Sequence, residues 1–262
     1  MRKVPSILPW ITTPALLIVV TVIWEVAVRT FEISPLVLPA PSVVFQELIV
    51  VLQTPVTWSH IQTTITEIVL GFTFGVLAGL VVGVILGKAP LIEASVRPLI
   101  IALEVVPKVA LIPLFVIWFG FGMTTKVIIA ALLAFFPVML NVLLGIRSVD
   151  PGHRDVMRSV NAGRWKTFTH LEVKSMMPHM FAGMETAIVL AVIGTIVGEY
   201  LAGSEGLGYL VVRTLNELNA PALFAVIILL AAIGLIMYFL VTSMKRVFIP
   251  WHESVYGRRV AA

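Results

Sequence analysis

The sequence lacks cysteine altogether and has few charged residues. Of its 262 residues, 12% are charged and 59% are hydrophobic, and the mean hydropathy is +1.05. Without cysteine, the chain has neither a disulfide nor a thiolate metal site. A soluble domain is about 25% charged, so this composition excludes a chain that faces water along most of its length. We therefore expect the lipid bilayer to be its main solvent.

Several functional motifs are also missing. The sequence has no GxxxxGK[ST] phosphate-binding loop, so we expect no ATP hydrolysis by this chain. Its five histidines do not occur at HxxxH or HExxH spacing, which argues against a dedicated metal site. No nucleophile–base pattern indicates a catalytic residue. We expect a protein that is not an enzyme, with no metal or other cofactor bound by this chain.

Six apolar stretches have the length that a membrane-spanning helix needs, about 20 residues. Unpaired backbone groups are too costly in lipid for other conformations, so these stretches predict helices. The prediction is an all-α membrane protein, residues 1–262 forming a single domain, with spans at about residues 10–28, 65–86, 99–119, 127–146, 184–201 and 222–241.

The positive charges predict the orientation. If the N-terminus is cytoplasmic, 14 of the 18 lysines and arginines fall in inner segments and only Arg29, Lys126 and Arg213 in outer ones. By the positive-inside rule, both termini are then cytoplasmic. This topology accounts for the basic charge, so nucleic acid is not an expected partner. In the outer segment 29–63, Ser42 is the expected N-cap of a short helix.

The second span carries a glycine at every fourth position: Gly71, Gly75, Gly79 and Gly83, followed by Gly87 at its end. Small residues at this spacing let two helix backbones approach closely in a membrane. We interpret the stripe as a helix-packing surface rather than a ligand or ion site.

The inner segment 147–183 is too polar to span and has a helical pattern of apolar residues with basic residues between them. Asn161, Ala162 and Gly163 interrupt the pattern, and Asn and Gly tolerate left-handed backbone. We expect a short helix, a turn and a second helix that enters the membrane near Pro178. The pattern alone fits either a docking site for a partner or a solvated basic loop.

This segment resembles the EAA loop of bacterial ABC importer permeases. With the register set by RWKTF, Pro178 and Gly183, the residues Asp155, Val156 and Met157 match EAA, and Asn161, Ala162 and Gly163 match GAS. Asp replaces Glu, Asn replaces Gly, and Lys174 stands where a proline is usual. LPAPSVVFQEL, PKVALIPLFVIWFGFG, FFPVMLN and VGEYLAGSEGLGYL are similar to segments of the nitrate/sulfonate/taurine-type permeases.

The resemblance implies a type I ABC importer permease in the bacterial inner membrane. It implies a homodimer of this chain, two ATPase subunits that use ATP and Mg²⁺, and an extracytoplasmic solute-binding protein. The matching positions assign ATPase coupling to Asp155, Val156, Met157, Asn161, Ala162, Gly163, Arg164 and Phe168. The family resemblance leads us to expect a small anionic or aromatic/heterocyclic organic solute.

Four polar residues within the predicted spans are candidates for lining a substrate pathway: Glu104, Lys108, Asn141 and Glu199. Glu104 and Lys108 are one helical turn apart, so they form either a self-neutralising pair or part of a gate. Asn141 is a candidate for helix packing or for the pathway. Glu199 either reaches the membrane interface, binds backbone amides of the GSEGLG segment, or lines the pathway.

A second class of function is a self-contained oligomeric secondary transporter or channel, because six helices suffice for either. The sequence has no internal repeat that would indicate an inverted-repeat transporter. A requirement for a separate ATPase, rather than an ion gradient, distinguishes the two classes.

Overall fold

The computed structural model describes residues 8–251, and in that part of the chain the protein is helical without a β-strand. The α-helices are α1 (Leu8–Thr30), α2 (Pro41–Gln53), α3 (Pro55–Lys88), α4 (Pro90–Val105), α5 (Ile112–Phe119), α6 (Met123–Arg147), α7 (Pro151–Ser159), α8 (Arg164–Thr167), α9 (Val173–Ala202), α10 (Leu207–Asn216) and α11 (Ala220–Phe248). A 3-10 turn, η1 (Lys108–Leu111), precedes α5, and a π-helical turn, η2 (Phe168–Glu172), joins α8 to α9. The predicted all-α class is confirmed.

Prolines set where several helices begin. Pro41, Pro55, Pro90 and Pro151 each occupy the first turn of a helix, where the missing N–H is not needed. The expectation that Ser42 is an N-cap is therefore wrong, because α2 begins one residue earlier. The Ser42 N–H instead donates to Glu25 Oε2 of α1 at 3.0 Å, and its hydroxyl donates to Oε1 at 2.8 Å.

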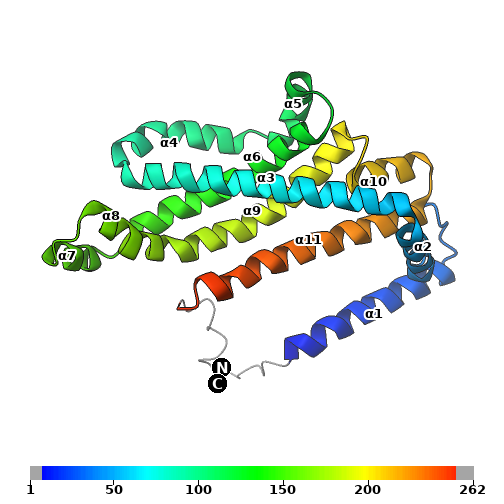
Figure 1. Cartoon of the computed structure of the whole chain (residues 1–262). Helices are drawn as coiled ribbons and strands as arrows, with labels where there is room; N and C mark the ends of the chain where they lie inside the picture. The colour runs from blue at the N-terminus through cyan, green and yellow to red at the C-terminus, as the bar shows by residue number, and fades with distance from the viewer. Residues whose placement is uncertain (1–7, 252–262) are drawn as a thin grey trace.

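The centre of the bundle is α6, which packs along α3 on one side and α9 on the other (Figure 1). The apolar side chains between these helices include Ile68, Val138, Val142 and Ile188, all at most 2% exposed. Helix α11 packs against α2, α9 and α10. Helices α7 and α8 lie at one end of the bundle, and α2 and α10 lie at the other.

The glycine stripe of α3 lies against α6. A Cβ atom at Gly75 would stand 2.6 Å from the Ala131 carbonyl oxygen, and one at Gly79 would stand 2.7 Å from the Phe135 oxygen. Gly71 and Gly83 make similarly close approaches to α6. A side chain at any of these positions would collide with atoms of α6, so the two helix backbones can only meet this closely at glycine.

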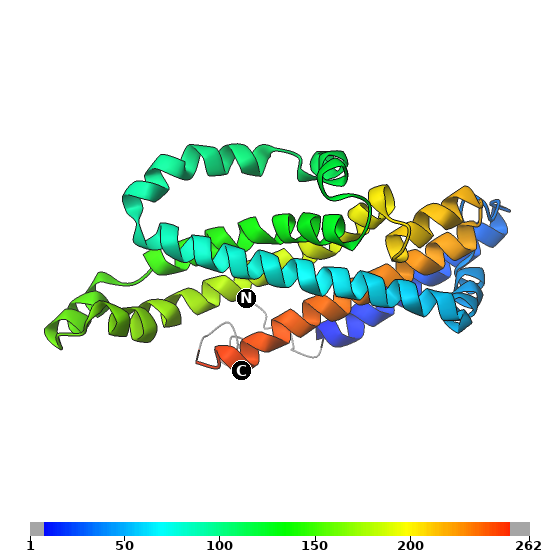
Figure 2. The same ribbon diagram turned by 45° about the horizontal axis from the view of Figure 1, so that its top comes forward.

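The third predicted span is not one continuous helix. Helix α4 and the segment Lys108–Phe119 meet at an angle of 82°, with the break at Val106 and Pro107. Pro107 has no N–H to continue the helix, and its ring clashes with the preceding turn. Figure 2 shows α4 arching away from α3 and α6 before the chain returns through α5. The expectation of a single helix over residues 99–119 is therefore wrong.

Five helices in residues 8–251 are long and apolar enough to cross a membrane, and the bent pair brings the number to six if it counts as one span. Observed helices extend beyond the predicted spans: α3 has 34 residues and α9 has 30. Helix α6 begins at Met123, so Lys126 belongs to its first turn. Lys126 is 2% exposed, and the prediction that it lies in a loop is wrong.

Candidate functional site

The segment from α7 to η2 folds as two short helices around a sharp turn. Asp150 caps α7 through a 2.6 Å hydrogen bond from the Gly152 N–H. Asn161 has a φ of 52°, in the left-handed region that asparagine tolerates better than most residues. Gly163 then precedes the first turn of α8. We call residues 155–168 the terminal loop.

The terminal loop exposes large apolar side chains at the end of the bundle. Val156, Val160 and Trp165 are 58%, 67% and 75% exposed. The structure places all eight predicted coupling residues in this loop; each is exposed or half-buried: Asp155, Val156, Met157, Asn161, Ala162, Gly163, Arg164 and Phe168. Exposed apolar side chains interleaved with charges are typical of a surface that binds another protein.

Charged contacts tie the terminal loop to the bundle. Lys88, the last residue of α3, forms a 3.0 Å ion pair with Glu172 and lies 4.1 Å over the Phe168 ring. Arg154 of α7 donates to the Ile146 carbonyl of α6 at 3.2 Å. At the same end, Glu93 of α4 pairs with Arg147 of α6 at 3.0 Å. The end of α3 therefore contacts η2, the end of α6 contacts α7, and α4 is held to the end of α6.

Two of the pathway candidates lie at the break in the third span. Glu104 is exposed at the end of α4, and Lys108 begins η1. The predicted Glu104–Lys108 ion pair is absent in the described part of the chain, because the helix breaks between the two residues. The Lys108 ammonium instead donates to the Glu104 carbonyl at 2.9 Å and stands 4.7 Å from the centre of the Phe136 ring of α6.

Asn141 lies where α6 meets α9. Its Nδ2 donates to the Pro137 carbonyl at 2.8 Å, and a Cβ at Gly183 of α9 would approach the Asn141 Cβ within 2.9 Å. The side chain thus contributes to helix packing here. No hydrogen bond or ion pair in residues 8–251 joins it to Glu104 or Lys108.

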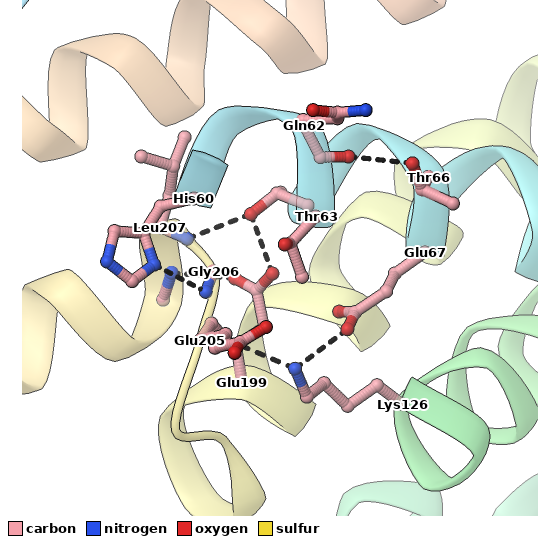
Figure 3. A network of polar contacts seen from close by, with 12 residues as sticks. His60, Gln62, Thr63, Thr66, Glu67, Lys126, Glu199, Glu205, Gly206 and Leu207 are labelled. Carbon is pink, nitrogen blue, oxygen red and sulfur yellow. Dashed lines mark hydrogen bonds and ion pairs between the residues drawn. The ribbon is translucent and has the colours of Figure 1, made fainter. Parts of the chain in front are cut away.

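Glu199 is buried in a polar cluster (Figure 3). This cluster lies toward the end of the bundle opposite the terminal loop, near α10. Its Oε1 accepts a 2.6 Å hydrogen bond from the Thr64 hydroxyl of α3, and its Oε2 accepts one of 2.7 Å from the Gly208 N–H. Of the three roles left open by the sequence, the one observed is binding a backbone amide of the GSEGLG segment. Gly206, with a φ of 104°, gives that segment a turn that favours glycine.

Glu67 and Lys126 complete this cluster, and neither was a predicted site residue. The Lys126 ammonium of α6 is 2.7 Å from Glu67 Oε1 of α3 and donates to the Glu205 carbonyl at 3.1 Å. Glu67 is fully buried. A signal existed in the sequence, because Glu67 is a lone acid inside an apolar stretch and such residues are rarely without a specific role.

A family model described as "Binding-protein-dependent transport system inner membrane component" matches residues 71–250. The chain belongs to this family. It is therefore a permease subunit of an ABC importer in the inner membrane, and this confirms the family resemblance of the sequence.

Curated relatives agree along nearly the whole permease. It is 30% identical to a formylaminopyrimidine transport permease protein of Halalkalibacterium halodurans, over 89% of this chain and 92% of the relative. A riboflavin transport system permease protein of Chloroflexus aurantiacus is 30% identical, over 94% and 92% of the two chains. The taurine transport system permease protein of Escherichia coli is 29% identical, over 92% and 89%.

A solved structure has the same fold. The crystal structure of an amino acid ABC transporter with histidines matches with a TM-score of 0.56, over 77% of the permease and 96% of that chain. The sequences are 21% identical, so this likeness bears on the fold alone.

Proposed function

We propose that this permease forms the substrate pathway of an ATP-driven importer and that its terminal loop docks a separate ATPase subunit. The observation that carries the proposal is the exposure of Val156, Val160 and Trp165 on a loop that projects from the end of the bundle (Figure 1). Burying these side chains against a partner removes apolar surface from water, which favours association.

The charge around the loop suits an acidic partner surface. A cleft of about 710 Å³ lies between the loop and the ends of α3 and α6. Its lining contains four basic residues and one acidic residue: Lys88, Arg154, Arg158, Arg164 and Glu172. Complementary charge guides encounter and fixes the orientation of a complex. We expect acidic side chains on the ATPase to face this cleft.

The contacts behind the loop provide a route for movement into the membrane. A docked ATPase that displaces α7 pulls on Arg154 and hence on the Ile146 carbonyl near the end of α6. Displacement of η2 pulls on Lys88 through Glu172 and Phe168. Both links are short and polar, so the loop moves together with the ends of two membrane helices.

The remaining parts of the assembly follow from the same family assignment. We expect two copies of the permease, two ATPase subunits and an extracytoplasmic solute-binding protein. ATP and Mg²⁺ are held by the ATPase, and this chain holds no cofactor. The distribution of lysine and arginine supports cytoplasmic termini and a cytoplasmic terminal loop.

The proposed substrate is a small anionic or aromatic/heterocyclic organic solute. The names of the relatives support this class, since they include permeases for formylaminopyrimidine, riboflavin and taurine.

We place Glu104 and Lys108 beside the pathway, because they lie at the break of a span that arches away from the bundle. Neutralising them singly and together should reduce transport; unchanged uptake and unchanged coupled ATPase activity in all three variants would refute this placement.

The docking role is tested by Trp165→Glu in the reconstituted importer. A carboxylate in an apolar contact is costly, so the variant should lose most of its bound ATPase and its coupled uptake. Trp251→Glu is the matched control, because Trp251 is also an exposed tryptophan, at 55%, but lies outside the loop. Equal ATPase retention in the two variants would contradict docking at the loop. Uptake driven by an ion gradient without an ATPase would instead support a secondary transporter.

A further inference from the structure

The polar cluster at the α10 end contains more acid than base. Glu67 from α3, Glu199 from α9 and Lys126 from α6 are 0%, 0% and 2% exposed. Two carboxylates and one ammonium would leave an uncompensated negative charge in a buried site, which is expensive. The hydrogen bonds around each group indicate where the charges are.

Glu199 has the environment of a carboxylate. Thr64 accepts from the Leu207 N–H at 2.8 Å and therefore turns its single proton toward Glu199 Oε1. The Gly208 N–H donates to Glu199 Oε2. Both oxygens accept, so Glu199 needs no proton of its own. Lys126, which donates to Glu67 Oε1 and to the Glu205 carbonyl, supplies the matching positive charge.

Glu67 has a different environment. Its Oε1 accepts from Lys126, but its Oε2 is buried and no donor reaches it in the described part of the chain. Figure 3 shows the Glu67 carboxyl group pointing from α3 toward Glu199 and Lys126. Two ionised carboxylates buried beside one another repel each other, whereas a protonated Glu67 has an O–H to donate to Glu199.

The other charged groups near the cluster do not supply a second cation. His60 Nδ1 accepts from the Gly206 N–H at 2.9 Å, so that nitrogen carries no proton. Arg213 of α10 is paired with Glu217 at 2.9 Å. The Glu205 side chain is exposed, and only its backbone carbonyl enters the cluster.

We propose that Glu67 is a proton-binding site: a neutral carboxylic acid whose O–H donates to the Glu199 carboxylate, between Lys126 and the α9–α10 corner. The proton makes the cluster neutral overall and gives the orphaned oxygen a partner. Because donor and acceptor are carried by α3 and α9, the proton links these two helices at the end of the bundle opposite the terminal loop.

Infrared spectroscopy of the purified full-length permease at pH 7.5 tests the proposal, because a protonated carboxylic acid has a C=O stretch well separated from that of a carboxylate. We expect this band in the wild type and its loss in Glu67→Gln. Glu93→Gln is the matched control: Glu93 is a buried glutamate held by Arg97 and Arg147 at 2.8 and 3.0 Å, so it is ionised and its replacement leaves the band unchanged.

A second measurement does not depend on the band. The amide of Glu67→Gln can donate to Glu199 as a protonated acid does, so this variant should unfold within a few degrees of the wild type. Glu199→Gln places an NH₂ group against the donors from Thr64 or Gly208 and should be clearly less stable. A wild type without the protonated-acid band, or an unfolding order in which Glu67→Gln is the less stable variant, would overturn the proposal.

Discussion

Replacing Gly75 by alanine probes the close approach of α3 and α6. The added methyl group would stand 2.6 Å from the Ala131 carbonyl oxygen and 2.7 Å from the Ala134 Cβ. The carbonyl belongs to the backbone of a helix and cannot rotate away. Extra methyl groups in a well-packed interior cost about 1–3 kcal/mol.

A matched control removes the effect of helix propensity, since alanine is favoured over glycine in a helix interior by about 1 kcal/mol in water. Gly234 lies in the middle of α11, where a Cβ would meet only the Val192 Cγ1 at an ordinary 3.6 Å. Both substitutions gain the same propensity. The difference between Gly75→Ala and Gly234→Ala therefore isolates the steric term of about 1–3 kcal/mol.

The assay is thermal unfolding of the two variants in the same detergent, together with the yield of folded permease. At about 2–4 °C per kcal/mol for a chain of this size, Gly75→Ala should unfold several degrees below Gly234→Ala. Equal unfolding temperatures would mean that the two helices can move apart without cost, and the close packing of α3 on α6 would be refuted.

Three further outcomes are expected. Lys126→Met should leave the Glu199 charge uncompensated and cost about 3–5 kcal/mol, measured as a lower yield and unfolding temperature; wild-type stability would contradict the role of Lys126 in balancing the Glu199 charge. Asn161→Gly should keep ATPase coupling while Asn161→Val, which disfavours a positive φ, should reduce it; equal coupling would show that the turn is unimportant. Glu172→Gln should weaken the link to Lys88 and lower uptake per ATP hydrolysed with little change in ATPase binding; unchanged uptake per ATP would argue against this route.

The sequence predicted the features that depend on length and local pattern. Apolar stretches of about 20 residues indicated helices, and the Asn161–Gly163 interruption indicated a turn between a short helix and a second helix that enters the membrane, because both depend on local backbone chemistry. The third span was predicted as one helix, although Pro107 lies inside it. A proline can kink a membrane helix or end it, and only the packing of α4 away from α6 decides which.

The buried cluster could not be predicted from local pattern, because its members come from α3, α6, α9 and the turn before α10. Lys126 follows a glycine-containing turn and looks like a loop residue, but Glu67 of another helix holds it inside the protein. Glu199 was recognised as a candidate, and binding to the GSEGLG backbone was one of its anticipated roles. Its partner Thr64 lies 135 residues earlier in the chain, a separation at which sequence carries no local signal.

Site-specific cross-linking tests the central claim, ATPase docking at the terminal loop, most directly. The chain has no cysteine, so Val160→Cys introduces a unique thiol at a position 67% exposed in the loop. Val247→Cys, 74% exposed near the end of α11, is the control. In the assembled importer, a short thiol-reactive cross-linker should join the ATPase to the Val160→Cys permease and leave the Val247→Cys permease unlinked. Cross-linking at Val247→Cys but not at Val160→Cys would contradict the account.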